Sequence, residues 1–258
     1  VEAAHGRMLD STIAPATARI ADLTAKPALL SVVGRAEGPA GDALHIATDT
    51  PLNAKLGKYL KGLTAGGRCA LALDLELPLM HPASRVDGTL DFQDGTLDFP
   101  GKITLSHVNG PLQFTKTGVH GQGITATILG YPATVSAGTL RTDQVHMTYF
   151  EAQGQTDVAH LQGLKFIDLP FARALTGRTP WRAKLQLSES SAGGKVRPAL
   201  LIESTLKGMG IDLPAPLGKA PAEPVNLTVR IDALGHPAPP SSFRYGRRLS
   251  GAMRMDGE

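Results

Sequence analysis

Alternation between apolar and polar residues is the feature that most constrains how this chain can fold. Residues 69–77 read CALALDLEL, so leucine occupies every second position from Leu71 to Leu77. A period of two places all four leucines on one face of a β-strand, with Asp74 and Glu76 on the other. The same period recurs at residues 103–105, 112–114, 124–128, 183–187 and 227–231. The sequence therefore predicts a mainly β protein.

Residues that favour turns separate these segments. Asn109-Gly110-Pro111 and Gly121-Gln122-Gly123 are two examples. The chain holds 29 Gly and 19 Pro but only 7 Phe, 4 Tyr and 1 Trp, a composition that argues against a helical bundle. Consecutive strands joined by short turns pair antiparallel, so we expect antiparallel meanders.

One repeated segment predicts a hairpin. Residues 87–99 read DGTLDF, then Gln93, then DGTLDF again. Asp and Gly both tolerate positive φ, so Asp94-Gly95 favours a tight turn between two short strands. Leu90 and Phe92 would then share one face with Leu97 and Phe99.

Helices are expected to be few and short, near residues 51–61, 157–163 and 169–176. Pro51 suits the first position of the first of them.

A weak internal repeat predicts the domain organisation. Leu63-Thr64 followed by the leucine strand resembles Leu175-Thr176 followed by residues 183–187, at an offset of 175 − 63 = 112. We expect N-terminal strands in residues 1–45 and two diverged β-repeat modules, residues 46–155 and 156–258. Stacked modules of this kind build elongated proteins. We also expect the chain to be a piece of a longer polypeptide.

The residues show no pattern that points to catalysis, a metal or a cofactor. The formal net charge of +3 is too small to indicate nucleic acid as a partner. Cys69 is the single cysteine, which excludes an internal disulfide and a cysteine-rich zinc site. The eight histidines have no metal-ligand spacing, and no Gly-x-Ser-x-Gly motif occurs. No apolar run is long enough to span a membrane as a helix.

One basic cluster stands out, made of Arg244, Arg247 and Arg248 with Phe243 and Tyr245 between them. Such residues suit stacking on single-stranded nucleic acid or contacts with phospholipid headgroups. A solvated strand edge is the simpler interpretation, and we favour it.

Three segments resemble a known family. Residues 175–185 (LTGRTPWRAKL) match a segment of the form L-S/T-G followed by T-x-W-x-A-x-L, and residues 204–219 (STLKGMGIDLPAPLGK) match S-x-L-x-G-x-x-x-D-L-P-A-P-L-x-K. Residues 110–119 and 129–132 resemble G-x-L-x-F-x-x-x-G-V followed by L-G-G-P. These motifs are typical of the large YhdP proteins, part of the AsmA-like group of Gram-negative envelope proteins. Cys69 departs from the motif, because it stands where the second module has Trp181.

The resemblance implies a periplasmic location and an inner-membrane anchor helix outside this sequence. It implies a long, curved antiparallel β-sheet whose apolar groove carries phospholipid between the inner and outer membranes and supports envelope integrity. Envelope proteins are possible further partners, and no catalytic residue comes with the family. Under this hypothesis the groove is lined by six leucines: Leu71, Leu73, Leu75, Leu77, Leu185 and Leu187.

Two alternatives stay open at the level of sequence. The same leucines would fill an ordinary closed core, since every β protein alternates. The chain would then be a structural or scaffolding β-repeat module that binds protein partners. An enzyme acting on polysaccharide is a third hypothesis, and it would need paired carboxylates in a cleft.

Overall fold

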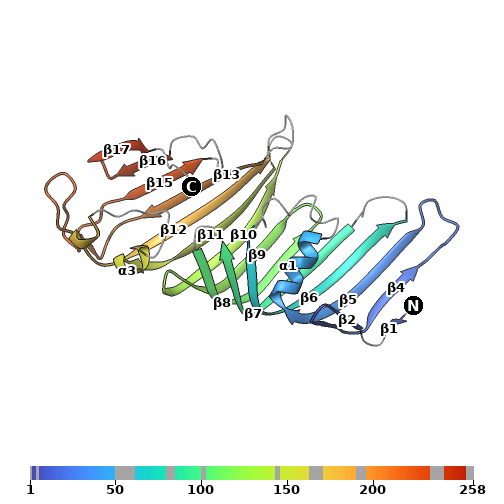
Figure 1. Ribbon diagram of the computed structural model, residues 1–258. Helices are drawn as coiled ribbons and strands as arrows, with labels where there is room; N and C mark the ends of the chain where they lie inside the picture. The colour runs from blue at the N-terminus through green and yellow to red at the C-terminus, as the bar shows by residue number, and fades with distance from the viewer. Residues whose placement is uncertain are drawn as a thin grey trace. The chain divides into compact units, whose positions relative to one another are not determined.

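The computed structural model describes residues 2–3, 6–49, 62–79, 85–99, 103–142, 146–162, 171–189, 196–232 and 241–253. Over these residues the chain is mainly β, with antiparallel strands and only short helices, as the alternation predicts (Figure 1). It divides into two compact units. The first comprises Val1–Pro100 and Thr104–Ala126, and the second comprises Gly101–Ile103 and Thr127–Glu258.

The first unit is an antiparallel sheet, and its described residues include one short helix. Its central strand β6 pairs with β5 on one side and β7 on the other, and β5 pairs in turn with β4 and β3. Strands β8 and β9 follow β7, and all but Ile103, Thr127 and Ile128 of these two belong to this unit. The elements are β1 (Glu2–Ala3), β2 (Gly6–Met8), β3 (Ser11–Ile13), β4 (Ala16–Ile20), β5 (Leu29–Pro39), α1 (Ala40–Asp49), β6 (Thr64–Pro78), β7 (Arg85–Phe99), β8 (Ile103–Thr115) and β9 (Val119–Ile128).

The hairpin expected at Asp94-Gly95 is wrong, because β7 runs unbroken through both residues. Arg68 pairs with Gln93 and Gly66 with Thr96, so β7 takes three residue steps where β6 takes two. This is a β-bulge: Asp94 has a φ of 54°, in the left-handed region that turns also use. The extra residue shifts the alternation by one position. Leu97 and Phe99 therefore share a face with Leu90 and Phe92, as expected, but for a different reason.

Gly67 lies opposite this bulge and cannot carry a side chain there. Its φ is 75°, and a Cβ would lie 2.3 Å from the carbonyl oxygen of Asp94. We expect Gly67→Ala to lower the free energy of unfolding by about 2–4 kcal/mol in urea denaturation followed by circular dichroism.

Gly66→Ala is the matched control for this prediction. The nearest atom to a Cβ on Gly66 is the Thr96 Cβ at 3.8 Å, and Gly66 has no positive φ. Equal losses in the two variants would contradict the role of the bulge.

The second unit is also an antiparallel sheet. Its strands pair in the order β10, β11, β12, β13, β15, β16, β17, and the short β14 pairs with the start of β12. The elements are β10 (Tyr131–Arg141), β11 (His146–Asp157), α3 (Val158–Gln162), the 3-10 helix η1 (Ala172–Ala174), β12 (Leu175–Glu189), β13 (Val196–Ser204), β14 (Met209–Ile211), β15 (Leu227–Asp232), β16 (Ser241–Tyr245) and β17 (Leu249–Met253).

The helix predictions have mixed outcomes. The helix expected at 157–163 is confirmed as α3. The one expected at 169–176 is wrong at its end, because only residues 172–174 form a 3-10 turn and Leu175 already begins β12. The segment 51–61 lies outside the described residues, and the sequence did not predict α1. Among the described helices, none combines the length and the apolar character needed to cross a membrane.

A closed core occupies one end of the second unit. Leu206, Met209, Val225 and Tyr245 are buried there, and Val158 and Leu161 of α3 pack against them. The Tyr245 hydroxyl donates a hydrogen bond to the Leu217 carbonyl oxygen at 2.7 Å, which ties the loop after β14 to this core.

Candidate functional site

In the first unit, the four leucines of β6 lie in a row on one face of the sheet. Residues directly opposite one another on antiparallel strands share a face. The residues opposite the leucine row are all apolar or glycine. They are Ala36, Gly34, Val32 and Leu30 on β5 and Leu90, Gly88 and Val86 on β7. The apolar face therefore extends across three strands.

The opposite face of the same strands is charged. Asp74 and Glu76 alternate with the leucines, and both lie near Arg85 on β7, at 3.9 and 4.0 Å. Arg85 also pairs with Asp87 at 2.5 Å, and the side chains of this cluster are all well exposed. Exposed ion pairs stabilise little. They make one face of this sheet polar, whereas the other face is apolar.

The β6 leucines are only half-buried, although their direct neighbours are apolar. Val86, opposite Leu75, is 4% exposed. A sealed core would bury the leucines to a similar degree. In the described part of the chain, the β6 leucines instead keep part of their surface accessible.

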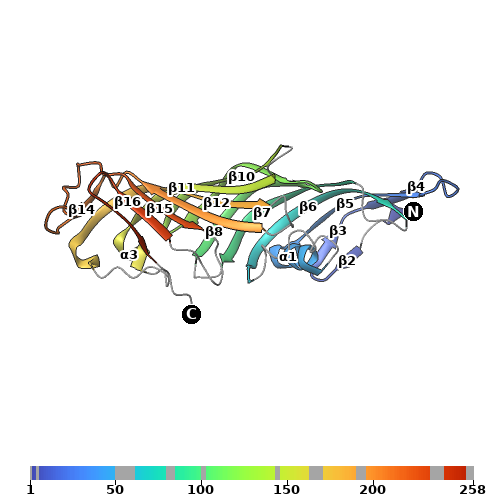
Figure 2. The ribbon, with the colours of Figure 1, turned by 90° about the horizontal axis from the view of Figure 1, so that it is seen from above.

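Helix α1 packs at one end of this face (Figure 2). Ala40 of the helix and Cys69 of β6 are both buried. Burial raises the pKa of the Cys69 thiol, and the negative charge of Asp42 adds to the effect. Asp42 also accepts hydrogen bonds from the Asp10 backbone N–H at 2.9 Å and the Ser11 hydroxyl at 2.7 Å, which fastens α1 to the β2–β3 turn. Cys69 is therefore a packing residue, as its sequence context suggests.

The second unit repeats the two-faced pattern on β12. Ala183, Leu185 and Leu187 share one face of this strand. The residues opposite Ala183 and Leu185 on the flanking strands are Ala152 and Phe150 on β11 and Ile202 and Leu200 on β13. Val229 and Ile231 on β15 continue the apolar face.

The other face of these strands is again polar. Glu151 pairs with Arg182 at 3.3 Å and with Lys184 at 3.8 Å. The Lys184 ammonium also lies 4.7 Å from the centroid of the Tyr149 ring. Arg230 on β15 pairs with Asp232 at 2.9 Å.

The two leucines of β12 differ in burial. Leu185 is half-buried like the β6 row, whereas Leu187 is 6% exposed. The six predicted residues thus fall into two sets, four on β6 in the first unit and two on β12 in the second. Five of the six are half-buried.

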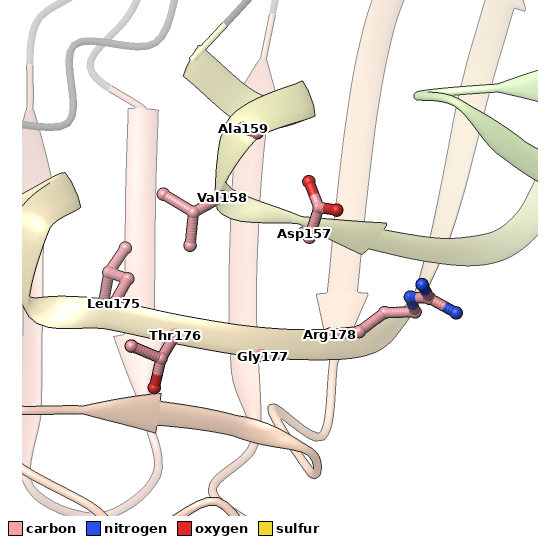
Figure 3. Close-up of a pocket in the computed structure, with 7 residues that line it drawn as sticks. All are labelled: Asp157, Val158, Ala159, Leu175, Thr176, Gly177 and Arg178. Atoms are coloured by element: carbon pink, nitrogen blue, oxygen red, sulfur yellow. The ribbon is translucent and has the colours of Figure 1, made fainter.

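A pocket of about 450 Å³ lies beside α3 in the second unit (Figure 3). Its polar wall is built on Asp157, whose carboxylate accepts hydrogen bonds from the Tyr131 hydroxyl at 2.6 Å and the His160 ring at 2.8 Å. The Arg178 guanidinium lies 4.1 Å from the centroid of the Tyr131 ring. The pocket is lined by Asp157, Val158, Ala159, Leu175, Thr176, Gly177 and Arg178.

This polar group is structural. Asp157 also accepts a hydrogen bond from the His160 backbone N–H at 3.1 Å, which caps the first turn of α3. The Tyr131 hydrogen bond is the largest of the causes that hold the pKa of Asp157 well below its ordinary value, followed by the His160 ring. The cluster therefore joins the start of β10, the end of β11 and α3.

We expect Asp157→Asn to destabilise the second unit at neutral pH. A carboxyl with a lowered folded pKa contributes stability above its ordinary value of 3.8, and this contribution is lost as the pH falls further. The gap in unfolding midpoint between wild type and variant should narrow on acidification below that value. Thermal unfolding at a series of pH values checks this, and a gap independent of pH would contradict it.

His107 and, from the basic cluster, Arg248 also have local explanations. His107 contacts Asp94 at 2.7 Å beside the bulge, with both side chains largely exposed. Arg248 donates to the Gly218 carbonyl oxygen at 2.9 Å and pairs with Glu223, so it holds a loop. Within the described part of the chain, no group of three His, Cys, Asp or Glu residues is placed to hold a metal ion.

Comparison with known proteins identifies the family. The family model described as YhdP protein matches residues 1–258. The chain belongs to the YhdP family.

A curated relative is the intermembrane phospholipid transporter YhdP of Escherichia coli K12. It is 26% identical over 202 residues, which is 77% of this chain. The match covers 15% of the relative, so the chain spans a small part of that protein's length. No solved structure matches the chain.

The YhdP-like motif at 204–219 forms the loop over the closed core of the second unit. Lys219, its last residue, is buried and donates hydrogen bonds to the carbonyl oxygens of Leu206 and Ala220, both at 2.9 Å, and of Met209. Burial lowers the pKa of its ammonium group. The motif is therefore conformational in this chain: a buried lysine joins three carbonyls of the loop, two of which, on Leu206 and Ala220, also accept a backbone N–H.

The YhdP-like motif at 175–185 places Trp181 opposite Gly154 on β11. A Cβ on Gly154 would lie 3.3 Å from the Trp181 ring atom Cζ2, so the glycine leaves space for the indole. Among the described residues, the buried indole N–H has no hydrogen-bond partner. Sequence reasoning missed both this contact and the Lys219 interactions, although the motifs contain the residues involved.

Proposed function

We propose that this chain is a section of a longer periplasmic YhdP protein whose apolar sheet faces shield the acyl chains of phospholipid. The name of the Escherichia coli relative, an intermembrane phospholipid transporter, supports the lipid as cargo. The 15% of the relative that the match covers supports a longer polypeptide. We place the membrane anchor of that polypeptide outside this chain.

The observation that carries the proposal is the half-buried leucine row of β6. Its neighbours on β5 and β7 are apolar, yet the leucines keep part of their surface accessible. An acyl chain of about 16 carbons crossing water would expose methylenes worth about 0.8 kcal/mol each, on the order of 12 kcal/mol in all. An open apolar face lowers that barrier without directional bonds. The charged opposite face remains in contact with water.

The six leucines named from the sequence are the proposed lining. Leu71, Leu73, Leu75 and Leu77 would contact acyl chains in the first unit and Leu185 in the second, where Leu187 would complete the apolar face as a buried residue. We extend the proposed lining to Val32 on β5 and Leu90 on β7, which share the face of the β6 row.

Native mass spectrometry of the chain, extracted gently from its host, tests this function. We expect bound phospholipid, which lipid extraction and chromatography would identify. A chain that carries no lipid and instead retains protein partners would favour the scaffolding alternative. Transport toward the outer membrane and envelope integrity are then tested by complementation of a permeability defect with the full-length protein.

A further inference from the structure

The most exposed large apolar side chain in the described part of the first unit, Leu23, lies at one hairpin with further exposed apolar side chains beside it, while Met8, Leu9 and Val33 are exposed elsewhere in the unit. Strands β4 and β5 are joined by residues 21–28, a loop that projects past the neighbouring strands (Figure 2). Leu23 in this loop is 76% exposed, Ile20 at the end of β4 is 37% exposed, and Leu79 just after β6 is 40% exposed. We call these three residues the hairpin tip.

The hairpin tip continues the apolar face described above. Ile20 pairs with Leu30, and Leu30 pairs with Leu77 at the end of the leucine row. The Leu79 backbone N–H donates to the Ala28 carbonyl oxygen at 2.8 Å, which carries the β5–β6 pairing up to the loop. An apolar surface therefore runs along β6 and emerges at the tip.

The charged residues around the hairpin tip indicate which kind of surface it would bind. Arg19 and Lys26 flank it, against the single carboxylate of Asp22. That carboxylate accepts hydrogen bonds from the Thr24 backbone N–H and hydroxyl, both at 2.7 Å, so it is satisfied within the loop. Aliphatic side chains beside a small excess of cations are typical of segments that dip into a bilayer interface carrying anionic lipid.

The residue types also argue against a protein as the occupant. Protein interfaces concentrate their binding energy in tryptophan, tyrosine and arginine that fill shaped pockets. Residues 16–33 contain no aromatic side chain. Leucine and isoleucine on a projecting loop match a fluid acyl layer, which needs no fixed shape.

We propose that the hairpin tip contacts the surface of a phospholipid bilayer and inserts Leu23 among the lipids. This goes beyond the proposed function, because a groove can carry lipid without touching a bilayer itself. A tip in the interface would give acyl chains an apolar path between the membrane and the leucine row.

Vesicle flotation tests the proposal with the 258-residue chain. The vesicles contain phosphatidylethanolamine with a minor share of phosphatidylglycerol. We expect the chain to float with them, also in high salt, because apolar insertion is not screened as charge attraction is. Leu23→Asp should lower the partition coefficient by about tenfold or more. The matched control is Leu140→Asp, since Leu140 on β10 is 53% exposed and lies in the second unit. This control should float like wild type.

A fluorescent label gives a second, local measurement. Cys69 is buried, so in a Leu23→Cys variant an environment-sensitive maleimide dye should label the loop alone. We expect its emission to shift to the blue when vesicles are added. Absence of flotation, an unchanged emission, or Leu23→Asp and Leu140→Asp losing equally would each overturn the proposal. Bound phospholipid in the native mass spectrum is an independent readout, so failure at the tip leaves the proposed function standing.

Discussion

Leu75→Asp is expected to leave the first unit folded and to remove its bound lipid. Leu75 is half-buried, so a carboxylate there reaches water when no lipid is present, and we expect a loss of about 1–2 kcal/mol in the free energy of unfolding. An acyl chain lying over the carboxylate would strip it of water, and this desolvation cost disfavours lipid binding. Urea denaturation measures the first effect, and native mass spectrometry for bound phospholipid measures the second.

The matched control is the residue directly opposite. Val86 pairs with Leu75 across the strands but is buried, so Val86→Asp should cost about 3–5 kcal/mol or force the carboxyl to protonate. The second unit offers the same contrast on one strand. Leu185→Asp should be tolerated and Leu187→Asp should not, because only Leu187 is buried. A Leu75→Asp variant that unfolds, or that folds and keeps its full lipid load, would disprove the assignment of this leucine.

Lys219→Met is expected to destabilise the second unit by about 1–3 kcal/mol. Methionine keeps the apolar stem of the side chain but removes the ammonium donor from the carbonyl oxygens of Leu206, Met209 and Ala220, of which those of Leu206 and Ala220 keep a backbone N–H partner. Each buried group that loses its partner costs about 1–3 kcal/mol. Trp181 is the single tryptophan and lies in the second unit, so its fluorescence follows the unfolding of that unit.

Lys207→Met is the control for the lysine prediction. Lys207 belongs to the same loop but is exposed, so its replacement should change stability by less than about 0.5 kcal/mol. Similar losses in the two variants would mean that the hydrogen bonds of Lys219 add nothing to the stability of the second unit.

Strand faces could be predicted from the sequence because alternation is a geometric property of a strand and needs no knowledge of its neighbours. The leucines of residues 71–77 share a face in the structure for that reason. What alternation could not supply is the degree of burial. Leu185 and Leu187 are equivalent by period, and their different exposure depends on what packs nearby.

The wrong hairpin prediction and the features that the sequence did not predict also have specific causes. Asp94-Gly95 favours positive φ, and both a hairpin turn and a β-bulge use that conformation, so the dipeptide alone does not distinguish them. Helix α1 begins in Ala40-Gly41-Asp42, where glycine weakens the helical signal. Lys219 donates its hydrogen bonds to backbone carbonyls, which every residue has, so no pattern of side chains in the sequence predicts them.

The bulge at Asp94 shows how a two-faced sheet limits changes in chain length. Each residue of β6 faces one side or the other according to whether its position is odd or even, and in β7 this assignment reverses at the bulge. Deleting one residue from the middle of β6 would turn the following leucines toward the charged side and bring carboxylates onto the apolar side. Length changes within these strands are therefore tolerable only in pairs, or next to a bulge that restores the phase. Residue types in these strands can change as long as the alternation is kept, whereas strand length can change only by such steps.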